Sequence, residues 1–151
     1  MSRAEELRYL VLAAQREGNR LLGARLRPLN LTPAQAEVLV LLNERKVLTL
    51  NGLGELLVCE SGTNPSRLVG RLVTQGLVER TRSTTDGREV LLQLTSTGRR
   101  VAAQAAAAEE ELHELLEVLA TRHDVDATLS LLRDLIGNLP SGQAVARRFP
   151  R

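Results

Sequence analysis

The sequence predicts a mainly α-helical fold with one small β-hairpin, and three observations support this prediction. Apolar residues recur at spacings of three and four over most of the chain. A cap residue followed by proline occurs twice, at Thr32-Pro33 and Asn64-Pro65, and such pairs are typical of helix starts. Two short β-like runs flank Asp86-Gly87, which is a strong hairpin-turn signal.

Two helices are expected in the first third of the chain. The first covers residues 3–27 and ends there, because the residue before Pro28 is driven out of the α region. The second starts at Pro33 with Thr32 as its cap and extends to about Glu44. Its predicted apolar face consists of Ala36, Val38, Leu39, Leu41 and Leu42.

A helix-turn-helix is expected next. Residues 47–50 form a short extended piece, a short helix then continues through Leu57, and residues 59–63 form a turn. A further helix covers residues 66–75 and ends at Gly76, which suits a left-handed cap. Its predicted buried stripe consists of Leu68, Val69, Leu72 and Val73.

Residues 77–82 and 89–94 are the predicted hairpin strands, and the polar loop 83–88 joins them. This loop is longer than a two-residue turn needs, so we expect the hairpin to project into solvent as a wing. The predicted fold class is therefore a winged helix-turn-helix flanked by N- and C-terminal helices.

Two more helices follow, the first of them long. The long helix begins at Ser96 or Thr97, and the last helix begins after Asp124 or Asp126 and is closed by Pro140. On the long helix, the apolar residues alternate steps of four and three, which is a heptad-type seam. A helix this long with acidic flanks in a small chain favours a subunit interface, and an intramolecular core against the last helix is the alternative. This seam consists of Val101, Ala105, Ala108, Leu112, Leu115 and Leu119. Residues 140–151 are expected to form a flexible tail.

Composition limits the class of protein. The 151 residues are 43% hydrophobic and 25% charged, which excludes a largely disordered chain. No apolar run approaches the roughly 18 residues of a membrane span, and the N-terminus does not resemble a signal peptide. Cys59 is the single cysteine, so no internal disulfide can form. These features predict a soluble, cytoplasmic protein with no membrane partner.

The net charge of +2 hides two oppositely charged regions. Residues 61–100 hold seven arginines against three acidic residues, whereas residues 101–139 hold two arginines against eight. A local basic patch is what phosphate binding requires. Tyr9 and Phe149 are the sole aromatic residues, which disfavours stacking on single-stranded nucleic acid and leaves double-stranded DNA as the expected partner.

Candidate DNA-binding residues lie on the helix 66–75, off its buried stripe. A major groove about 12 Å wide admits one helix. Ser66 and Arg67 would reach base edges, and Arg71 is better placed for phosphate. Gly70 would permit close approach, and Thr74 completes this face, which consists of Ser66, Arg67, Gly70, Arg71 and Thr74. A solvated helix face is the alternative interpretation.

The wing supplies the other candidates, Arg80, Arg82, Asp86 and Arg88. An arginine at a hairpin tip suits the minor groove, where negative potential is focused. Asp86 is expected to orient the wing, since a carboxylate repels phosphate. An ion pair of Arg88 with Asp86 or Glu89 is the alternative for that arginine.

From about Arg3 to Leu139, the sequence resembles the multiple-antibiotic-resistance regulator (MarR) family of bacterial winged-helix transcription factors. The resemblance rests on LTPAQAEVLVLL, LTLNGLGELL, PSRLVGRLVTQGLVER and TTDGREVLLQLTSTGRRV. Within the last stretch, Asp86-Gly87-Arg88 matches the Asp-x-Arg signature of the family's wing, and Leu94-Thr95-Ser96-Thr97-Gly98 matches its Leu-Thr-x-x-Gly. The turn VCESGTNPS is about one residue longer than the family's connection, so the first base-contacting residue is fixed only to within one position.

The resemblance implies a homodimer that binds a pseudo-palindromic operator, as a repressor released by a small-molecule or oxidant signal. Within the single chain 1–151, residues 32–95 would form the DNA-binding lobe, and residues 1–27 and 96–139 the dimerisation lobe. The candidate dimerisation residues are Leu7, Val11, Leu112, Leu115, Leu119, Leu132, Leu135 and Leu139.

Other chemistry has little support in the sequence. Cys59 is a candidate redox sensor or a small buried hydrophobe, and the acidic Glu60 beside it would raise the thiol pKa. His113 and His123 show no metal-ligand spacing with Cys59, and no phosphate loop or catalytic triad is present, so no metal, cofactor or enzyme activity is predicted.

Two further functions stay open: a winged-helix module for protein–protein contact, and an architectural helical dimer. The five arginines of helix and wing disfavour both, since the core of a protein interface is usually depleted of charge.

Overall fold

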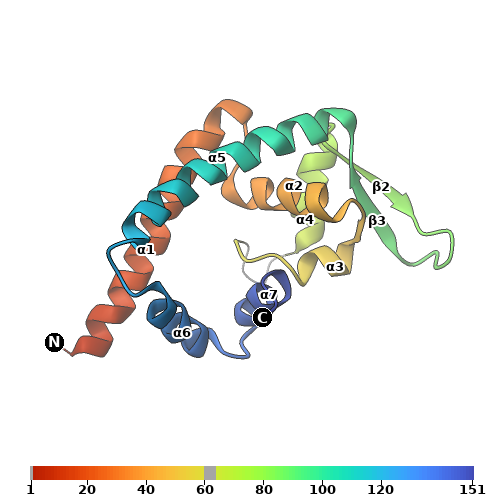
Figure 1. The fold of residues 1–151 in the computed structure, drawn as a ribbon. Coiled ribbons are helices and arrows are strands. Elements are labelled where there is room, and N and C mark those ends of the chain that lie inside the picture. The colour runs from red at the N-terminus through yellow and green to blue at the C-terminus, as the bar shows by residue number, and fades with distance from the viewer. Residues whose placement is uncertain (1, 60–63) are drawn as a thin grey trace.

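The computed structural model describes residues 2–59 and 64–151 (Figure 1). Its elements follow the predicted order, with one further helix at the C-terminus. They are α1 (Arg3–Leu26), the 3-10 turn η1 (Arg27–Leu29), α2 (Pro33–Arg45), β1 (Leu48–Thr49), α3 (Leu50–Gly54), α4 (Pro65–Thr74), β2 (Val78–Arg82), β3 (Val90–Leu94), α5 (Ser96–Ala120), α6 (Val125–Ile136) and α7 (Pro140–Arg148). No helix in the described part of the chain is long and apolar enough to cross a membrane.

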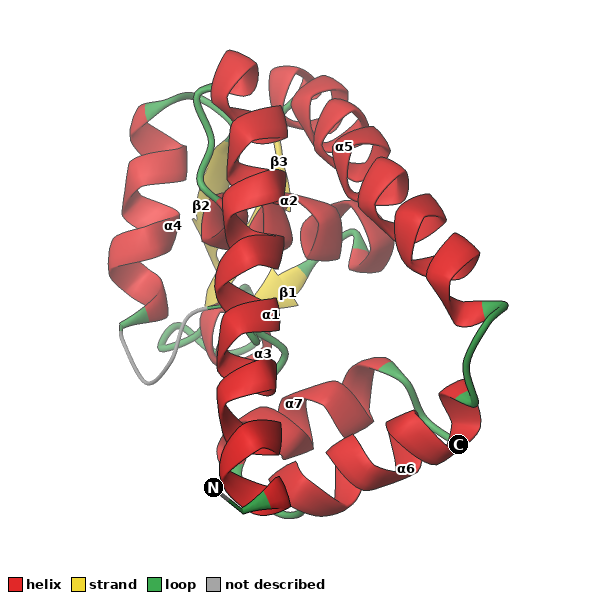
Figure 2. Ribbon diagram, turned by 90° about the vertical axis from the view of Figure 1, so that its left-hand side faces the viewer, coloured by secondary structure: helices red, strands yellow, loops and turns green. Residues whose placement is uncertain are grey.

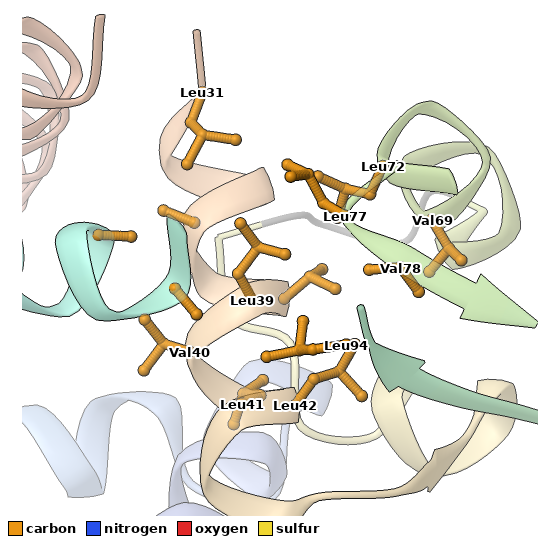
Figure 3. Close-up of a cluster of buried hydrophobic side chains, with 14 of the residues drawn as sticks. Leu31, Leu39, Val40, Leu41, Leu42, Val69, Leu72, Leu77, Val78 and Leu94 are labelled. Atoms are coloured by element: carbon orange, nitrogen blue, oxygen red, sulfur yellow. The ribbon is translucent and has the colours of Figure 1, made fainter. Parts of the chain in front are cut away.

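Helix α2 forms the centre of the molecule. Residues 35–42 are all buried, because α5, α4, β3 and α1 pack around the helix. Figure 3 shows its side chains in one apolar cluster with Val69 and Leu72 of α4 and Leu94 of β3. The sequence predicted one buried face, whereas a helix enclosed by neighbours buries residues all round.

The predicted helix starts are confirmed. The Thr32 hydroxyl accepts from the Gln35 amide while the Gln35 side chain accepts from the Thr32 amide, which makes a full capping box for α2. The Asn64 side chain caps α4 at the Ser66 amide, with Pro65 in the first helical turn. Helix α4 then ends before Gly76, whose φ of 73° is the left-handed conformation that glycine adopts freely.

The wing is part of a three-stranded antiparallel sheet with the order β1-β3-β2. Val78 pairs with Leu94 and Arg82 with Val90, while the extended piece expected at residues 47–50 contributes only the short β1. Helix α3 ends at Gly54, earlier than expected, since two of its five residues are glycine, a poor helix former. Apart from Cys59, the turn predicted at residues 59–63 lies outside the described residues.

The junction between the wing and α5 explains the Leu-Thr-x-x-Gly signature. Thr95 caps α5 by accepting from the Gly98 amide, and its hydroxyl donates to the Gly76 carbonyl at 2.7 Å. The Thr95 amide donates to the Leu77 carbonyl at 3.1 Å. A Cβ at Gly98 would lie 1.9 Å from that same carbonyl oxygen, so only glycine lets α5 start this close to the strand.

The heptad seam of α5 divides into two halves. Ala105 and Ala108 are buried within the chain, where α5 packs on α2 and α1, so an intramolecular core accounts for the first half. In the second half, Leu115 is 47% exposed and Leu119 is 48% exposed. The second half therefore has apolar surface to offer a partner.

The expectation of a flexible tail at residues 140–151 is wrong for most of that segment. Residues 140–148 form α7, which starts at Pro140 and buries Gly142 and Ala144. A Cβ at Gly142 would lie 2.4 Å from the Gly137 carbonyl oxygen, so the small residues allow α7 to pack tightly against the end of α6. Helix α6 itself ends at Ile136 instead of continuing to Pro140.

The Gly98→Ala variant should be destabilised by about 3 kcal/mol, because its Cβ would force the start of α5 away from β2. Urea unfolding followed by circular dichroism measures this free energy. Gly18→Ala is the matched control: nothing lies within 4 Å of its Cβ, and alanine in a helix should stabilise by about 0.5–1 kcal/mol. Equal effects of the two substitutions would contradict the close approach.

Candidate DNA-binding surface

Helix α4 separates a buried stripe from a polar face. Val69 and Leu72 are buried against the core. The predicted candidates lie off this stripe: Arg67, Arg71 and Thr74 are exposed, while Ser66 and Gly70 are half-buried. Figure 2 shows α4 at one side of the molecule, beside the strands. Both arginines are therefore accessible to a ligand as large as a duplex.

Gly70 and Arg80 are linked by a contact that the sequence did not reveal. The Arg80 guanidinium reaches from β2 to the Ser66 carbonyl oxygen at 3.4 Å. A Cβ at Gly70 would lie 3.2 Å from the same guanidinium. Gly70 thus leaves room for a side chain of the wing, in addition to the close approach to DNA that the sequence suggested. Thr74 donates its hydroxyl hydrogen to the Gly70 carbonyl.

Polar side chains build the tip of the wing. The Asp86 carboxylate accepts from the Arg88 amide at 3.0 Å, and the Glu89 amide donates to the Asp86 carbonyl at 3.0 Å. The Ser83 hydroxyl accepts from the amides of Thr85 and Asp86. Asp86 therefore shapes the turn, and the turn presents an exposed Arg88 at its end. Arg82, also exposed, donates to the Gly87 carbonyl at 3.4 Å.

A cleft of about 730 Å³ lies between α1, the start of α2 and α4. Arg20 of α1, which forms an ion pair with Glu17 at 2.7 Å, lines it together with Arg67 and Arg71 of α4, and no aromatic side chain is among its lining residues. The others are Asn19, Thr32, Pro33, Ala34, Gln35, Cys59, Asn64 and Leu68. Arg67 and Arg71 on this concave surface make it suited to a small anion, with Arg20 as a third cation whose charge Glu17 partly compensates. The sequence did not identify Arg20, because α1 and α4 are far apart along the chain.

Glu37 is a second residue that the sequence analysis missed. It lies in the middle of α2 and is 4% exposed. Its carboxylate accepts from the amides of Val58 and Cys59 at 2.9 and 2.8 Å, and it forms an ion pair with Arg148 of α7. In the sequence, the signal that could have identified Glu37 is a charged residue inside an otherwise apolar helical run.

The environment of Cys59 disfavours a reactive thiolate. Although the residue reaches solvent, burial of its thiol and the adjacent Glu37 charge raise the pKa of Cys59 to about 12. A reactive cysteine needs a lowered pKa. In the described part of the chain, no group of His, Cys, Asp and Glu side chains could hold a metal ion.

Comparison with known proteins decides the family. Residues 31–98 match the family described as a winged helix DNA-binding domain. The chain is 33% identical over 124 residues to the multiple antibiotic resistance protein MarR of Escherichia coli, covering 82% of this chain and 85% of that protein. The chain belongs to the MarR family.

Other members show the same relationship. The organic hydroperoxide resistance transcriptional regulator of Bacillus subtilis is 38% identical over 98 residues, which are 65% of this chain and 66% of that protein, just under two thirds. A crystal structure of mutant E. coli MarR complexed with operator DNA superposes with a TM-score of 0.70 at 30% identity, covering 87% of this chain and 94% of that one. Reduced AbfR bound to DNA gives a TM-score of 0.65 at 25% identity, with coverages of 85% and 94%.

Membership of the family thus accounts for the fold. The chain is a DNA-binding transcriptional regulator of the MarR family, with α3 and α4 as its helix-turn-helix and β2–β3 as its wing. The roles of its individual side chains stay predictions.

The Cys59 thiol of this MarR-family protein should be alkylated slowly by iodoacetamide at pH 8. With the pKa raised from 9.0 to about 12, the thiolate fraction falls on the order of a thousandfold relative to the unfolded chain. Mass spectrometry of the modified peptide, in buffer and in urea, gives both rates. Equal rates would show that the thiol is not buried against Glu37.

Proposed function

We propose that this MarR-family chain is a homodimeric repressor that binds a pseudo-palindromic operator and leaves it when a small anion binds. The observation that carries the proposal is the exposed pair Arg67 and Arg71 on α4, beside a wing that presents Arg88. An α-helix with exposed arginines fits the major groove, and an arginine on a hairpin tip fits the minor groove. MarR and AbfR have both been crystallised with DNA, and both are similar to this chain.

Each side chain of the surface has a proposed role. Ser66 and Arg67, in the first turn of α4, read base edges. Arg71, Arg80 and Arg82 bind phosphates, and Arg80 also braces the wing against α4 through the Ser66 carbonyl. Thr74 offers its hydroxyl oxygen as an acceptor, because its hydrogen is given to the Gly70 carbonyl. Asp86 orients the wing turn that carries Arg88.

The proposed dimer uses apolar surface that one chain leaves in solvent. Leu115 and Leu119 of α5 and Leu135 of α6 are about half exposed, and Leu139 is 62% exposed. Leu7, Val11, Leu112 and Leu132 are partly buried and border the same helices. Leucines in such number on neighbouring helices favour a protein interface. Two copies would place their α4 helices in successive major grooves, about one helical turn apart.

The cleft between α1 and α4 is the proposed effector site. Arg67 and Arg71 line it and also belong to the DNA-binding surface. An anion held there would neutralise the charge that DNA needs, so ligand and operator compete. Because the lining has no aromatic ring, we propose a small carboxylate or phosphate in place of a stacked aromatic. An oxidant signal through Cys59 has less support, since its thiol is held protonated.

The first test is specific binding. Wild-type protein selects duplexes from a random library, and fluorescence anisotropy compares the selected duplex with a scrambled one. A repressor of this kind should prefer the selected duplex by about a thousandfold or more. Equal, weak and salt-sensitive binding to both would contradict the proposal and favour a winged-helix module that contacts protein.

Arg88→Ala should weaken binding and lower the slope of log Kd against log salt by about one per subunit, because each wing loses one charged contact. Arg67→Ala should instead reduce the preference for the selected duplex, since a base contact worth about 1–3 kcal/mol is lost. The matched control is Arg122→Ala, an exposed arginine after α5 with the same change in charge. An Arg88→Ala slope equal to that of the control would contradict the role of the wing.

Octanoate and inorganic phosphate serve as probes of the cleft. An anion that acts there should weaken binding of the selected duplex, and Arg20→Ala should make the protein less sensitive to it without changing DNA affinity in its absence. Anisotropy titrations at constant ionic strength measure both effects. An unchanged response in Arg20→Ala would place the anion elsewhere.

A further inference from the structure

The turn that follows α3 is held by a buried carboxylate. Both oxygens of Glu37 are used: one accepts from the Val58 amide and the other from the Cys59 amide. These two residues lie shortly before Asn64, the cap of α4. Helix α3 itself touches the recognition helix, since a Cβ at Gly54, the last residue of α3, would lie 3.1 Å from Cγ of Pro65, the first residue of α4.

A buried carboxylate needs a counter-charge. Burying an unpaired charge is strongly unfavourable, whereas a pair that is fully hydrogen-bonded can be accommodated. Among the described residues, the ion pair to Glu37 comes from Arg148, which is 111 positions away in sequence. Glu109 of α5 is half-buried nearby, and burial raises the pKa of its carboxyl group, so this region tolerates negative charge poorly.

Helix α7 brings Arg148 to this position through two further contacts. Arg147, the preceding residue, donates to the Glu55 carbonyl at the end of α3, at 3.2 Å. At its other end, α7 packs on α6 through Gly142, against the carbonyl oxygens of Ile136 and Gly137. Figure 1 shows α7 between α6 and α3. The C-terminal helices thus connect exposed leucines of α6 with the base of the helix-turn-helix.

We propose that Arg148 is a positioning residue for DNA binding: through its ion pair with Glu37 it fixes Val58 and Cys59 after α3, and so couples α6–α7 to α3 and to the start of α4, against which α3 packs. This inference rests on the proposed function, because a positioned helix matters only if it binds DNA. Arg148 is 22% exposed and directed at Glu37, so it acts through this carboxylate and not through a phosphate. A shift of α6 in the dimer would reach α4 by this route.

The first arm of the test measures DNA binding of full-length variants. Arg148→Ala should raise Kd for the selected duplex about tenfold, in the range of ordinary coupling between sites, and leave Kd for a scrambled duplex unchanged. Arg148→Lys should recover much of the loss. Arg151→Ala, with the same charge change near the same helix, is the matched control and should behave as wild type. Circular dichroism and size-exclusion chromatography verify that each variant is folded and associates as wild type does.

The second arm needs no DNA. Hydrogen exchange of the Val58 and Cys59 amides, followed by NMR, should be at least about tenfold faster in Arg148→Ala than in Arg151→Ala. In Glu37→Gln, these amides should also exchange faster. Adding Arg148→Ala to Glu37→Gln should change neither the exchange rate nor Kd by more than about twofold, because the first substitution already removes the interaction that the second would remove.

Three results overturn the inference. If the two amides exchange at the same rate in Arg148→Ala as in the control, the ion pair does not hold the turn. If exchange is faster in Arg148→Ala but Kd is unchanged, the position of the turn does not affect DNA binding. Equal weakening on both duplexes assigns Arg148 to a phosphate. If the wild type selects no duplex, the proposed function fails and the positioning role fails with it, while the amide exchange still reports whether Arg148 holds the turn.

Discussion

The enclosure of α2 is the constraint on which the rest of this structure depends. Residues 35–42 are buried against four neighbouring elements, so α2 cannot shift without disturbing α5, α4 and the sheet together. The capping box at Thr32 fixes where the helix begins, and so where its buried residues fall. Because α4 packs on α2, and α2 packs on α5, the recognition helix has a defined position relative to the long helix. A major-groove reader needs such a fixed base.

The wing is tied to the same framework at one corner. Thr95 joins the end of β3, the turn after α4 and the first turn of α5 through a few hydrogen bonds, and Gly98 lets these segments meet. The family signature at this point is therefore a packing requirement rather than a DNA contact. Arg80 makes a second connection, between β2 and the start of α4. The wing and α4 are thus held together as one surface, which is the surface proposed to contact DNA.

Local signals were sufficient to predict most of the fold. Cap-proline pairs fixed the starts of α2 and α4, Gly76 fixed the end of α4, and Asp86-Gly87 located the wing. Helix α7 could not be predicted in this way, because its segment has few apolar residues and its contacts include the ion pair of Arg148 with a carboxylate 111 positions away. The cleft was missed for the same reason, since Arg20 and Arg71 meet only in the folded chain. Of the candidate site, the sequence located the exposed arginines but not the contacts of Arg80 and Glu37.

These contacts distinguish two ways in which DNA binding could be controlled. An anion in the cleft would act directly, because Arg67 and Arg71 cannot bind it and DNA at once, and no large movement is needed. A change at the dimer interface would act through α6, α7 and the Glu37–Arg148 pair, and would alter the approach of α4 without touching its arginines. The first would remove the base contact of Arg67 and also reduce the electrostatic affinity for any duplex, whereas the second would reduce selectivity alone. The two routes therefore differ in how they change the salt dependence of binding, even if both release the operator.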